Sequence, residues 1–270
     1  MIDAHVHFWK LDRGDYKWIT PARPTLMQDF LPSDFRQMIS ETEVSGCIAV
    51  QAARTETETD FLLDCASNNA FIKGVVGWTD LTIPDFIATL DRWQENEVFK
   101  GIRPMAGVQG CPEWLGVSYD AGLAALARRG LILEALALPH HLSGVATTAK
   151  THDDLQIVLN HAAKPTPNDL EQWTKDIAEF SELENVACKL SGLTQQSLNP
   201  DHHARVCDVL LDVFGPHRLI WGSDHPVVLE TSTYGAWLAA TQVLLSRLST
   251  AEQAQITSGT GQRIFRIQAN

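Results

Sequence analysis

The chain has 270 residues, of which 44% are hydrophobic and 20% charged, and its formal net charge is −12. The length suffices for a substantial core, and the composition is ordinary for a soluble globular protein. The acidic balance argues against a nucleic-acid partner or an anionic membrane surface, because both favour a basic face.

The cysteines and the apolar segments favour a cytoplasmic protein. The five cysteines are widely spaced and form no C-x-x-C pair, which argues against a disulfide framework or a zinc finger and fits a reducing cytosol. The N-terminus does not have the pattern of a signal peptide, because Asp3, His5 and His7 interrupt it. No apolar run approaches the roughly 20 residues of a membrane span, so we expect no membrane partner. The sequence leaves the oligomeric state open.

The first expected strand carries two histidines. Over residues 2–9 apolar side chains alternate with His5 and His7, which is the period-2 pattern of a β-strand. Residues two apart in a strand point to the same side, so both imidazoles face one place near the C-terminal end of this strand. Burying two neutral imidazoles without partners is costly, so the pattern favours a functional pair over core packing.

A long polar loop over residues 10–32 follows the first strand. Long loops in compact domains are usually functional or disordered. Because this loop carries Tyr16 and Trp18, we expect it to form a lid or a wall of a pocket. Ser33 is the expected N-cap of a helix that continues to Glu43.

Strands and helices then alternate along most of the chain. Further strands are expected at residues 47–51, 72–78, 99–103, 131–138, 155–161, 186–190 and 218–224. Helices are expected at residues 55–67, 84–96, 119–129, 166–183, 202–214, 234–248 and 251–265. A loop that holds Gly107, Gly110, Pro112 and Trp114 precedes the helix over 119–129.

This order of elements predicts a single α/β domain over residues 1–270. Buried apolar strands separated by helices imply a parallel sheet. Eight such strands suggest a closed (β/α)8 barrel, the TIM-barrel architecture. An open doubly wound sheet is the alternative, but no G-x-G-x-x-G follows the first strand and there is no Walker A motif.

Polar side chains stand at the C-terminal ends of four expected strands. They are His5 and His7 on the first strand, Arg103 on the fourth, His161 on the sixth and Asp224 on the eighth. In a barrel these ends converge on one face, where the chemistry of this fold is found. The first and eighth strands are neighbours, so His5, His7 and Asp224 should lie within a few ångströms of one another. Two imidazoles and a carboxylate suit a divalent metal, with zinc favoured by ligand type. Each residue alone has a simpler explanation, since Asp224 could cap a turn and His161 could be a core residue.

Several segments resemble the amidohydrolase superfamily, and most closely its lactonase branch, which includes L-fuconolactonases and 2-pyrone-4,6-dicarboxylate lactonases. The matching segments are residues 2–9 (IDAHVHFW), 50–53 (VQAA), 75–81 (VVGWTDL), 100–103 (KGIR), 158–161 (VLNH) with Lys164 and Pro165, 189–192 (KLSG), and 214–224 (FGPHRLIWGSD) with Pro226. They span nearly the whole chain in the order of the family. The resemblance implies a (β/α)8 barrel and hydrolysis of a cyclic ester.

The resemblance also implies roles for individual residues. His5, His7 and Asp224 match active-site residues of the first and eighth strands, His161 matches the histidine of the sixth, and Arg103 matches a residue that contacts the substrate.

The chain also departs from the superfamily pattern. The bridging lysine of the fourth strand and the metal-binding histidine of the fifth are not evident, and Glu134, His140 or His141 could substitute. We therefore expect at most one divalent metal, and catalysis without metal stays open. Asn160 stands where aspartate is common, and His225 where tryptophan is common.

Lactone hydrolysis needs an activated water, a polarised carbonyl and a protonated leaving oxygen. Asp224 is the candidate general base, because a carboxylate near the attacking water can take its proton. A metal held by His5, His7, Asp224 and Glu134 would polarise the carbonyl or bind the water. Without metal, hydrogen bonds from the histidines and Arg103 would have to do this. His161 could do the same or protonate the ring oxygen.

The substrate expected from these residues is a small neutral lactone. Arg103 is the only arginine at a strand end, although Arg13, Arg23 and Arg54 on loops could reach the site. This scarcity of arginines favours a sugar lactone, such as L-fucono- or L-rhamnono-lactone, over a pyrone dicarboxylate.

Apolar walls for the sugar ring could come from Trp9, Trp18 and Trp114.

Two other functions stay open: metal-dependent decarboxylation of an aromatic or unsaturated acid, and a non-catalytic barrel that binds a sugar acid.

Overall fold

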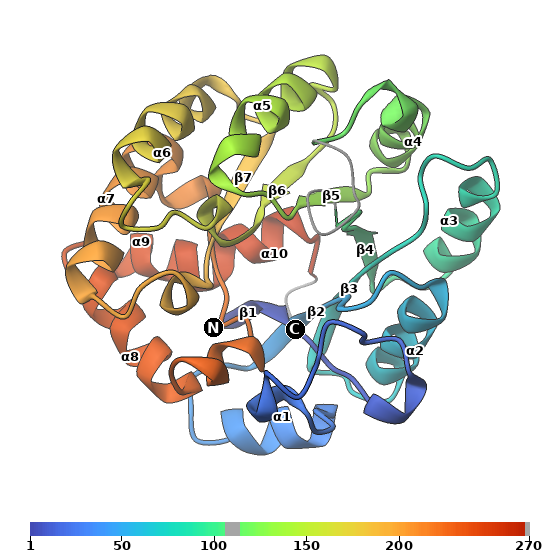
Figure 1. The fold of residues 1–270 in the computed structure, drawn as a ribbon, viewed down its shortest axis with the longest axis horizontal. Helices are drawn as coiled ribbons and strands as arrows, with labels where there is room; N and C mark the ends of the chain where they lie inside the picture. Colours follow the sequence, from blue (N-terminus) through green and yellow to red (C-terminus); the bar gives the residue numbers. More distant parts are fainter. Residues whose placement is uncertain (106–113, 268–270) are drawn as a thin grey trace.

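Short apolar segments pair as parallel strands in the order of the sequence and form one sheet (Figure 1). The computed structural model describes residues 1–105 and 114–267. The strands are β1 (Ile2–Val6), β2 (Gly46–Val50), β3 (Ile72–Gly77), β4 (Phe99–Ile102), β5 (Ile132–Ala135), β6 (Ile157–Leu159), β7 (Val186–Leu190) and β8 (Leu219–Trp221). Nearly all of their residues are buried, as expected for parallel strands covered on both faces. The predicted (β/α)8 barrel is confirmed.

The barrel closes between β1 and the segment that follows β8. Val6 forms an isolated parallel bridge with His225. The N–H of His7 donates to the carbonyl of His225 (2.7 Å), and the N–H of Asp224 donates to the carbonyl of His5 (2.9 Å). These bonds place the end of the first strand beside Asp224.

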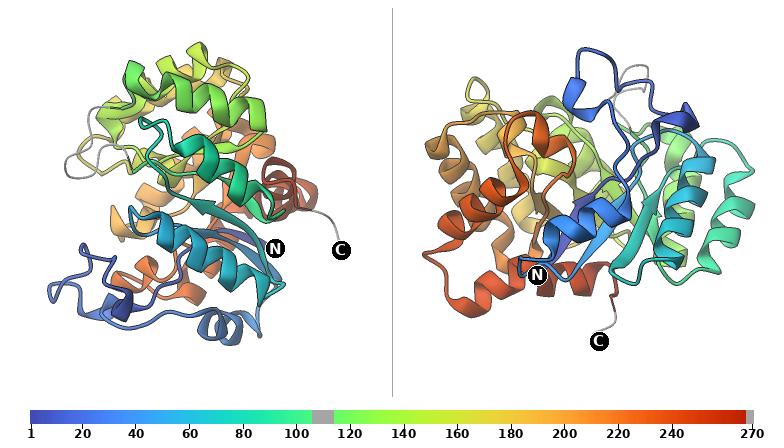
Figure 2. Two further views of the ribbon diagram at one scale, coloured as in Figure 1. Left: turned by 90° about the vertical axis from the view of Figure 1, so that its right-hand side faces the viewer. Right: turned by 90° about the horizontal axis from the view of Figure 1, so that it is seen from below.

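Most of the helices surround the strands on the outside, and α10 lies across one end of the barrel (Figures 1 and 2). The helices are α1 (Pro32–Ile39), α2 (Glu56–Ser67), α3 (Phe86–Gln94), α4 (Asp120–Arg129), α5 (Leu142–Thr151), α6 (Leu170–Ile177), α7 (Pro200–Arg218), α8 (Tyr234–Leu245), α9 (Thr250–Ala254) and α10 (Thr260–Ile264). The expected loop around Gly107, Gly110 and Pro112 lies outside the described residues.

Three helix predictions need correction. Ser33 is not the N-cap of α1: the helix begins at Pro32, and the carboxylate of Asp34 accepts a hydrogen bond from the N–H of Leu31 (2.9 Å). The helix expected from residue 166 begins only at Leu170. The helix expected over 251–265 is interrupted by a π-helical turn at Gln255–Gly259.

Helix α5 was not expected from the sequence. Glycine and β-branched residues weaken its helical propensity. Three of its threonine hydroxyls donate to the carbonyl four residues earlier, including Thr148 to Gly144 (3.0 Å). Its apolar side packs into the core through Leu142, Val145, Ala146 and Ala149. Tertiary packing therefore decides this helix, and its local pattern does not.

The inside of the barrel is apolar toward the N-terminal ends of the strands. This apolar layer consists of Ala4, Ile48, Val50, Val76, Ile132, Val158, Ala187 and Ile220, with Ile264 and Phe265 packed beneath it. The end of α10 and the residue that follows it thus close this end of the barrel.

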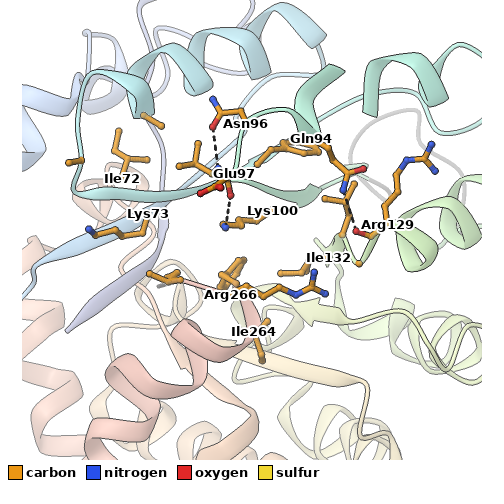
Figure 3. Close-up of a pocket in the computed structure, with 18 residues that line it drawn as sticks. Ile72, Lys73, Gln94, Asn96, Glu97, Lys100, Arg129, Ile132, Ile264 and Arg266 are labelled. Atoms are coloured by element: carbon orange, nitrogen blue, oxygen red, sulfur yellow. Dashed lines mark hydrogen bonds between the residues drawn. The ribbon is translucent and has the colours of Figure 1, made fainter. Parts of the chain in front are cut away.

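Beside this closed end lies a cavity of about 480 Å³ (Figure 3). Its lining includes Lys73 of β3, Lys100 of β4, Ile132 of β5, and Arg266. These strand residues lie at the N-terminal ends of their strands, and the chemistry of this fold occurs at the other end. Among the described residues, no helix has both the length and the apolar character needed to cross a bilayer.

Candidate active site

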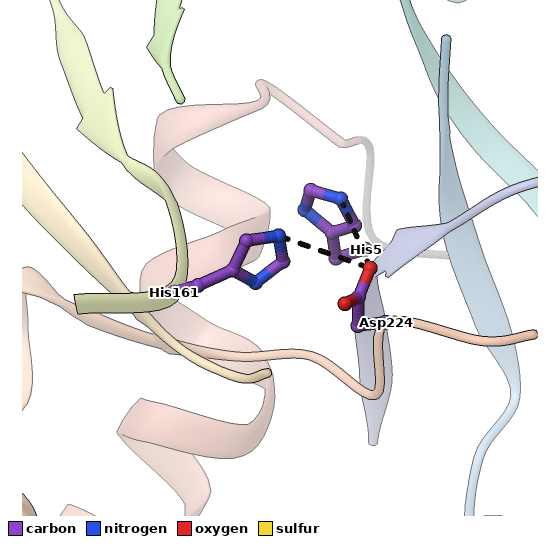
Figure 4. A group of neighbouring side chains, drawn as sticks. All are labelled: His5, His161 and Asp224. Carbon is purple, nitrogen blue, oxygen red and sulfur yellow. Dashed lines mark ion pairs between the residues drawn. The ribbon is translucent and has the colours of Figure 1, made fainter. Parts of the chain in front are cut away.

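Side chains from the first, sixth and eighth strand ends converge on one carboxylate oxygen (Figure 4). Asp224 Oδ1 lies 3.4 Å from His7 Nε2, 3.6 Å from His5 Nε2 and 3.8 Å from His161 Nε2. All four side chains are buried. The possible ligand atoms of His5, His161 and Asp224 lie within 4.8 Å of one another.

An irregularity in β1 orients the side chain of His5. The pairing of β1 with β2 shifts register between Asp3 and Val6, as at a β-bulge. The Asp3 carboxylate accepts hydrogen bonds from the N–H of His5 (3.2 Å), the N–H of Ser223 (2.8 Å) and the hydroxyl of Tyr234 (3.1 Å). Burial raises the pKa of Asp3 to about 6, although these hydrogen bonds oppose the rise. Asp3 thus ties the distorted end of β1 to the end of β8.

His161 and Asp224 both have left-handed backbone conformations. Strand β6 ends at Leu159, two residues before the predicted end, and a turn with positive φ runs from His161 (53°) to Lys164 (58°). Asp224 has φ of 63°. This conformation costs roughly 1–2 kcal/mol per residue outside glycine, and such strain clusters at active sites. Gly192 packs behind His161, where a Cβ atom would lie 2.8 Å from Nδ1.

The hydrogen bonds of the histidines indicate where their lone pairs point. The Nδ1 atom of His7 lies 2.7 Å from the carbonyl of Val50, which can only accept, so Nδ1 carries the proton. The Nε2 lone pair of His7 therefore faces Asp224. His161 Nδ1 hydrogen-bonds with the hydroxyl of Ser191 (2.8 Å). In metal sites, a hydrogen-bond partner on the ring nitrogen that does not bind the metal holds the imidazole in its orientation.

Burial keeps the histidines neutral, and neighbouring groups keep Asp224 charged. Burial lowers the pKa of His7, and it lowers that of His161 to about 3. Burial alone would raise the pKa of Asp224, but His161, His7 and Lys164 outweigh it and lower the value to about 2. Neutral imidazoles beside an ionised carboxylate are the protonation states in which these side chains bind a divalent cation.

Beneath this cluster lies a buried charged network that the sequence did not reveal as such. Lys189 Nζ lies 2.5 Å from Glu134 Oε1 and 3.1 Å from His5 Nδ1. The other oxygen of Glu134 accepts from Asn160 Nδ2 (3.1 Å). Glu134, which we predicted as a metal ligand, is thus engaged by Lys189 and lies outside the group of close ligand atoms. The one available signal was a lysine inside the apolar strand β7.

The two histidines that we considered, beside Glu134, as replacements for the missing superfamily ligands also lie outside that group. His140 is exposed, and His141 Nδ1 accepts a hydrogen bond from the N–H of Leu138 (3.1 Å).

Arg103 lies against the side of His5 and the end of β2. Its Nη2 donates to the carbonyl of Gln51, and its Nη1 lies 3.3 Å from His5 Nε2. His5 therefore has cations at both ring nitrogens, although a neutral imidazole can accept at only one. Burial, Lys189, the other two histidines and Arg103 together hold the pKa of His5 well below its usual value. Arg103 is only 4% exposed.

The three tryptophans predicted as pocket walls differ in exposure. Trp9 is fully buried and its indole donates to the carbonyl of Gln28 (2.8 Å). Trp114 is buried in the main core. Trp18 is partly exposed, and its indole donates to the carbonyl of Ala52 (2.7 Å). Of the three, Trp18 is therefore the one that a ligand can reach.

The arrangement agrees with the comparison to protein families. The family model described as amidohydrolase matches residues 2–267. The chain belongs to the amidohydrolase family.

Among curated relatives of this amidohydrolase, the L-fucono-1,5-lactonase of Burkholderia ambifaria is 34% identical, covering 98% of this chain and 95% of the relative. The L-fucono-1,5-lactonase of Burkholderia multivorans is 32% identical, with coverage of 98% and 96%.

Solved structures of amidohydrolases are also similar to this chain. An amidohydrolase from Burkholderia multivorans with bound zinc has a TM-score of 0.92 and 32% identity, with 99% of each chain covered. A 2,6-dihydroxybenzoate decarboxylase has a TM-score of 0.70 at 12% identity, over 98% of each chain, which shows a shared fold alone.

Proposed function

We propose that this amidohydrolase hydrolyses a sugar 1,5-lactone to the free sugar acid, with L-fucono-1,5-lactone as the first substrate to test. The observation that carries the proposal is the convergence of His5, His7 and His161 on the carboxylate of Asp224. The nearly full-length similarity to two L-fucono-1,5-lactonases supports the substrate class.

Asp224 is the general base in this proposal. It is charged, buried and held by a left-handed backbone at the end of β8. Its carboxylate takes a proton from water while the water oxygen bonds to the lactone carbonyl carbon and the C=O π pair moves to the carbonyl oxygen. When that pair re-forms the C=O bond, the ring C–O bond breaks and its electron pair goes to the ring oxygen, which receives the proton held by Asp224. Asp224 thus returns to its charged state.

The same cluster suits a divalent cation. We propose that His5, His161 and Asp224 would hold the cation, because their ligand atoms are mutually close and two imidazoles with one carboxylate suit zinc. His7 lies next to this set with its Nε2 lone pair directed at Asp224. When bound, such a cation polarises a carbonyl or lowers the pKa of a water. The zinc-bound Burkholderia structure supports zinc as the first candidate.

The test is acid release from a panel of aldonolactones in a weakly buffered pH-indicator assay. The purified chain should release acid from L-fucono-1,5-lactone, and rates should be compared after chelation and after zinc is restored. Thermal stabilisation by sugar acids without any acid release would indicate a binding protein. Release of CO₂ from an aromatic acid with no lactone opening would indicate a decarboxylase. Either result would contradict the proposal.

A further inference from the structure

Three cations lie near the proposed catalytic cluster, and two of them already have partners. Arg103 donates to Gln51, and Lys189 pairs with Glu134. Within the described part of the chain, the Lys164 ammonium has no hydrogen bond or ion pair. Lys164 is therefore the cation that is free to bind something else.

The backbone around Lys164 fixes it beside His161. The N–H of Lys164 donates to the carbonyl of His161 (2.7 Å) across the left-handed turn. Trp173 Nε1 of α6 donates to the carbonyl of Ala162 (2.8 Å), and His202 Nε2 of α7 lies 3.1 Å from the carbonyl of Pro165. The strained turn that carries His161 and Lys164 is thus held from two helices.

The charge of Lys164 acts on the catalytic cluster. The charge of Lys164 lowers the pKa values of Asp224 and His161. The Asp224 carboxylate does not come within 4 Å of the Lys164 ammonium, so the two groups do not form an ion pair. A partly buried ammonium without a partner is costly. Negative charge that develops on the substrate during the reaction would remove that cost.

We infer that Lys164 contacts the substrate and stabilises the negative charge that develops on the ring oxygen as the lactone opens. This inference rests on the proposed function for the reaction itself. The carbonyl oxygen already has the histidine cluster as its partner, whereas the ammonium of Lys164, unlike the cations of Arg103 and Lys189, has no partner among the described residues and is left for the leaving oxygen. In the step above, Lys164 keeps its protons and donates a hydrogen bond to that oxygen, while the proton that the oxygen takes comes from Asp224.

The test combines two Lys164 variants with two substrates. One is L-fucono-1,5-lactone, whose leaving oxygen is an alkoxide. The other is dihydrocoumarin, whose leaving oxygen is the much more stable phenoxide. Lys164→Met should lower kcat for the sugar lactone by about 10²-fold, as when one oxyanion donor is removed. The loss for dihydrocoumarin should be much smaller. Lys164→Arg keeps the charge and should recover most of the sugar-lactone activity.

The control is Lys175→Met, which removes the same charge from an exposed position on α6. It should leave both rates unchanged, and circular dichroism should show that all variants fold. Equal losses on both substrates would overturn the assignment to the ring oxygen. An arginine variant as slow as the methionine variant, or a methionine variant as fast as the wild type, would overturn the role of the charge. A wild-type chain inactive on both substrates would instead contradict the proposed function, and this inference with it.

Discussion

The inside of the barrel has two layers of opposite character. Toward the N-terminal ends of the strands, the apolar layer packs against Phe265 and needs no hydrogen bonds. Toward the C-terminal ends lies a charged layer of His5, Arg103, Glu134 and Lys189, all buried. The two layers are in contact, because Lys189 Nζ lies 5.5 Å from the centre of the Phe265 ring.

The difference shows where the fold gives up stability for chemistry. In or beside the charged layer, Arg103 Nε, Asn160 Oδ1 and His225 Nδ1 are buried without hydrogen-bond partners. The left-handed residues His161 and Asp224 lie at the same end. Strain and buried charge that stability does not require are expected at functional sites. In the apolar layer, by contrast, every side chain contributes to the hydrophobic core.

The largest effect is expected from breaking the charged layer. Lys189→Met leaves Glu134 buried without its cation, so unfolding free energy should fall by about 3–5 kcal/mol. Denaturant titration measures this, with the double variant Lys189→Met/Glu134→Gln as control, which should recover part of the loss. A single variant as stable as the wild type would show that the pair is not buried as described.

A cavity in the apolar layer should affect stability alone. Ile220 is 1% exposed, and Ile220→Ala should destabilise the chain by about 2–5 kcal/mol, as large-to-small core changes do. The kcat/KM of the remaining folded protein should stay close to that of the wild type. If kcat/KM fell sharply while stability was unchanged, the separation of the two layers would be wrong.

A buried carboxylate near the C-terminal end of β2 should also make the stability of the protein depend on pH. Glu58 is buried, and its carboxylate accepts from the N–H groups of Ala52 (2.9 Å) and Ala53 (2.7 Å). Burial raises the pKa of Glu58 from 4.5 to about 7, despite these hydrogen bonds. The native state therefore binds this proton more tightly than the unfolded state does. Its contribution to stability is complete below pH 4.5 and is lost as the pH rises through about 7.

Glu58→Gln removes this titration and serves as the matched reference. From pH 4.5 to above 7, the stability of the wild type relative to the variant should fall by up to about 3 kcal/mol. Denaturant titrations across this range measure the difference. A difference that stayed constant, or that grew with pH, would contradict the raised pKa.

The smallest effect is expected at the pocket wall. Trp18 is partly exposed beside the charged end, and a sugar ring against it would gain about 0.5–1.5 kcal/mol. Trp18→Ala should therefore raise KM about two- to tenfold with little change in kcat. Trp93→Phe is the control, because Trp93 on α3 is buried against Phe99 and its change should alter the melting temperature and not KM.

Much of the fold follows from local sequence, because apolar segments of strand length alternate with capped helices. The strand over 186–190 was predicted to the residue, and Gly130 ends α4 in a left-handed conformation, as expected of a helix terminator. Helix α5 was missed because threonines and a glycine hide its apolar face. The distortion in β1 was missed because it depends on Asp3 bonding to Ser223, far away in the sequence.

The convergence of His5, His7, His161 and Asp224 could be predicted because barrel topology brings strand ends together. The engagement of Glu134 by Lys189 could not, since it depends on which residues of β5 and β7 point inward at the same level. The position of Lys164 depends on a left-handed turn that the local sequence pattern does not predict.

The most direct test of the account is the rate of L-fucono-1,5-lactone opening by Asp224→Asn. The substitution keeps the size of the side chain and removes its ability to take a proton from water. Because general-base catalysis is worth about 10²–10⁴ in rate, kcat should fall at least about a hundredfold. Circular dichroism and the melting temperature should show an intact fold. A folded Asp224→Asn variant that opens the lactone at nearly the wild-type rate would contradict the central role of this carboxylate.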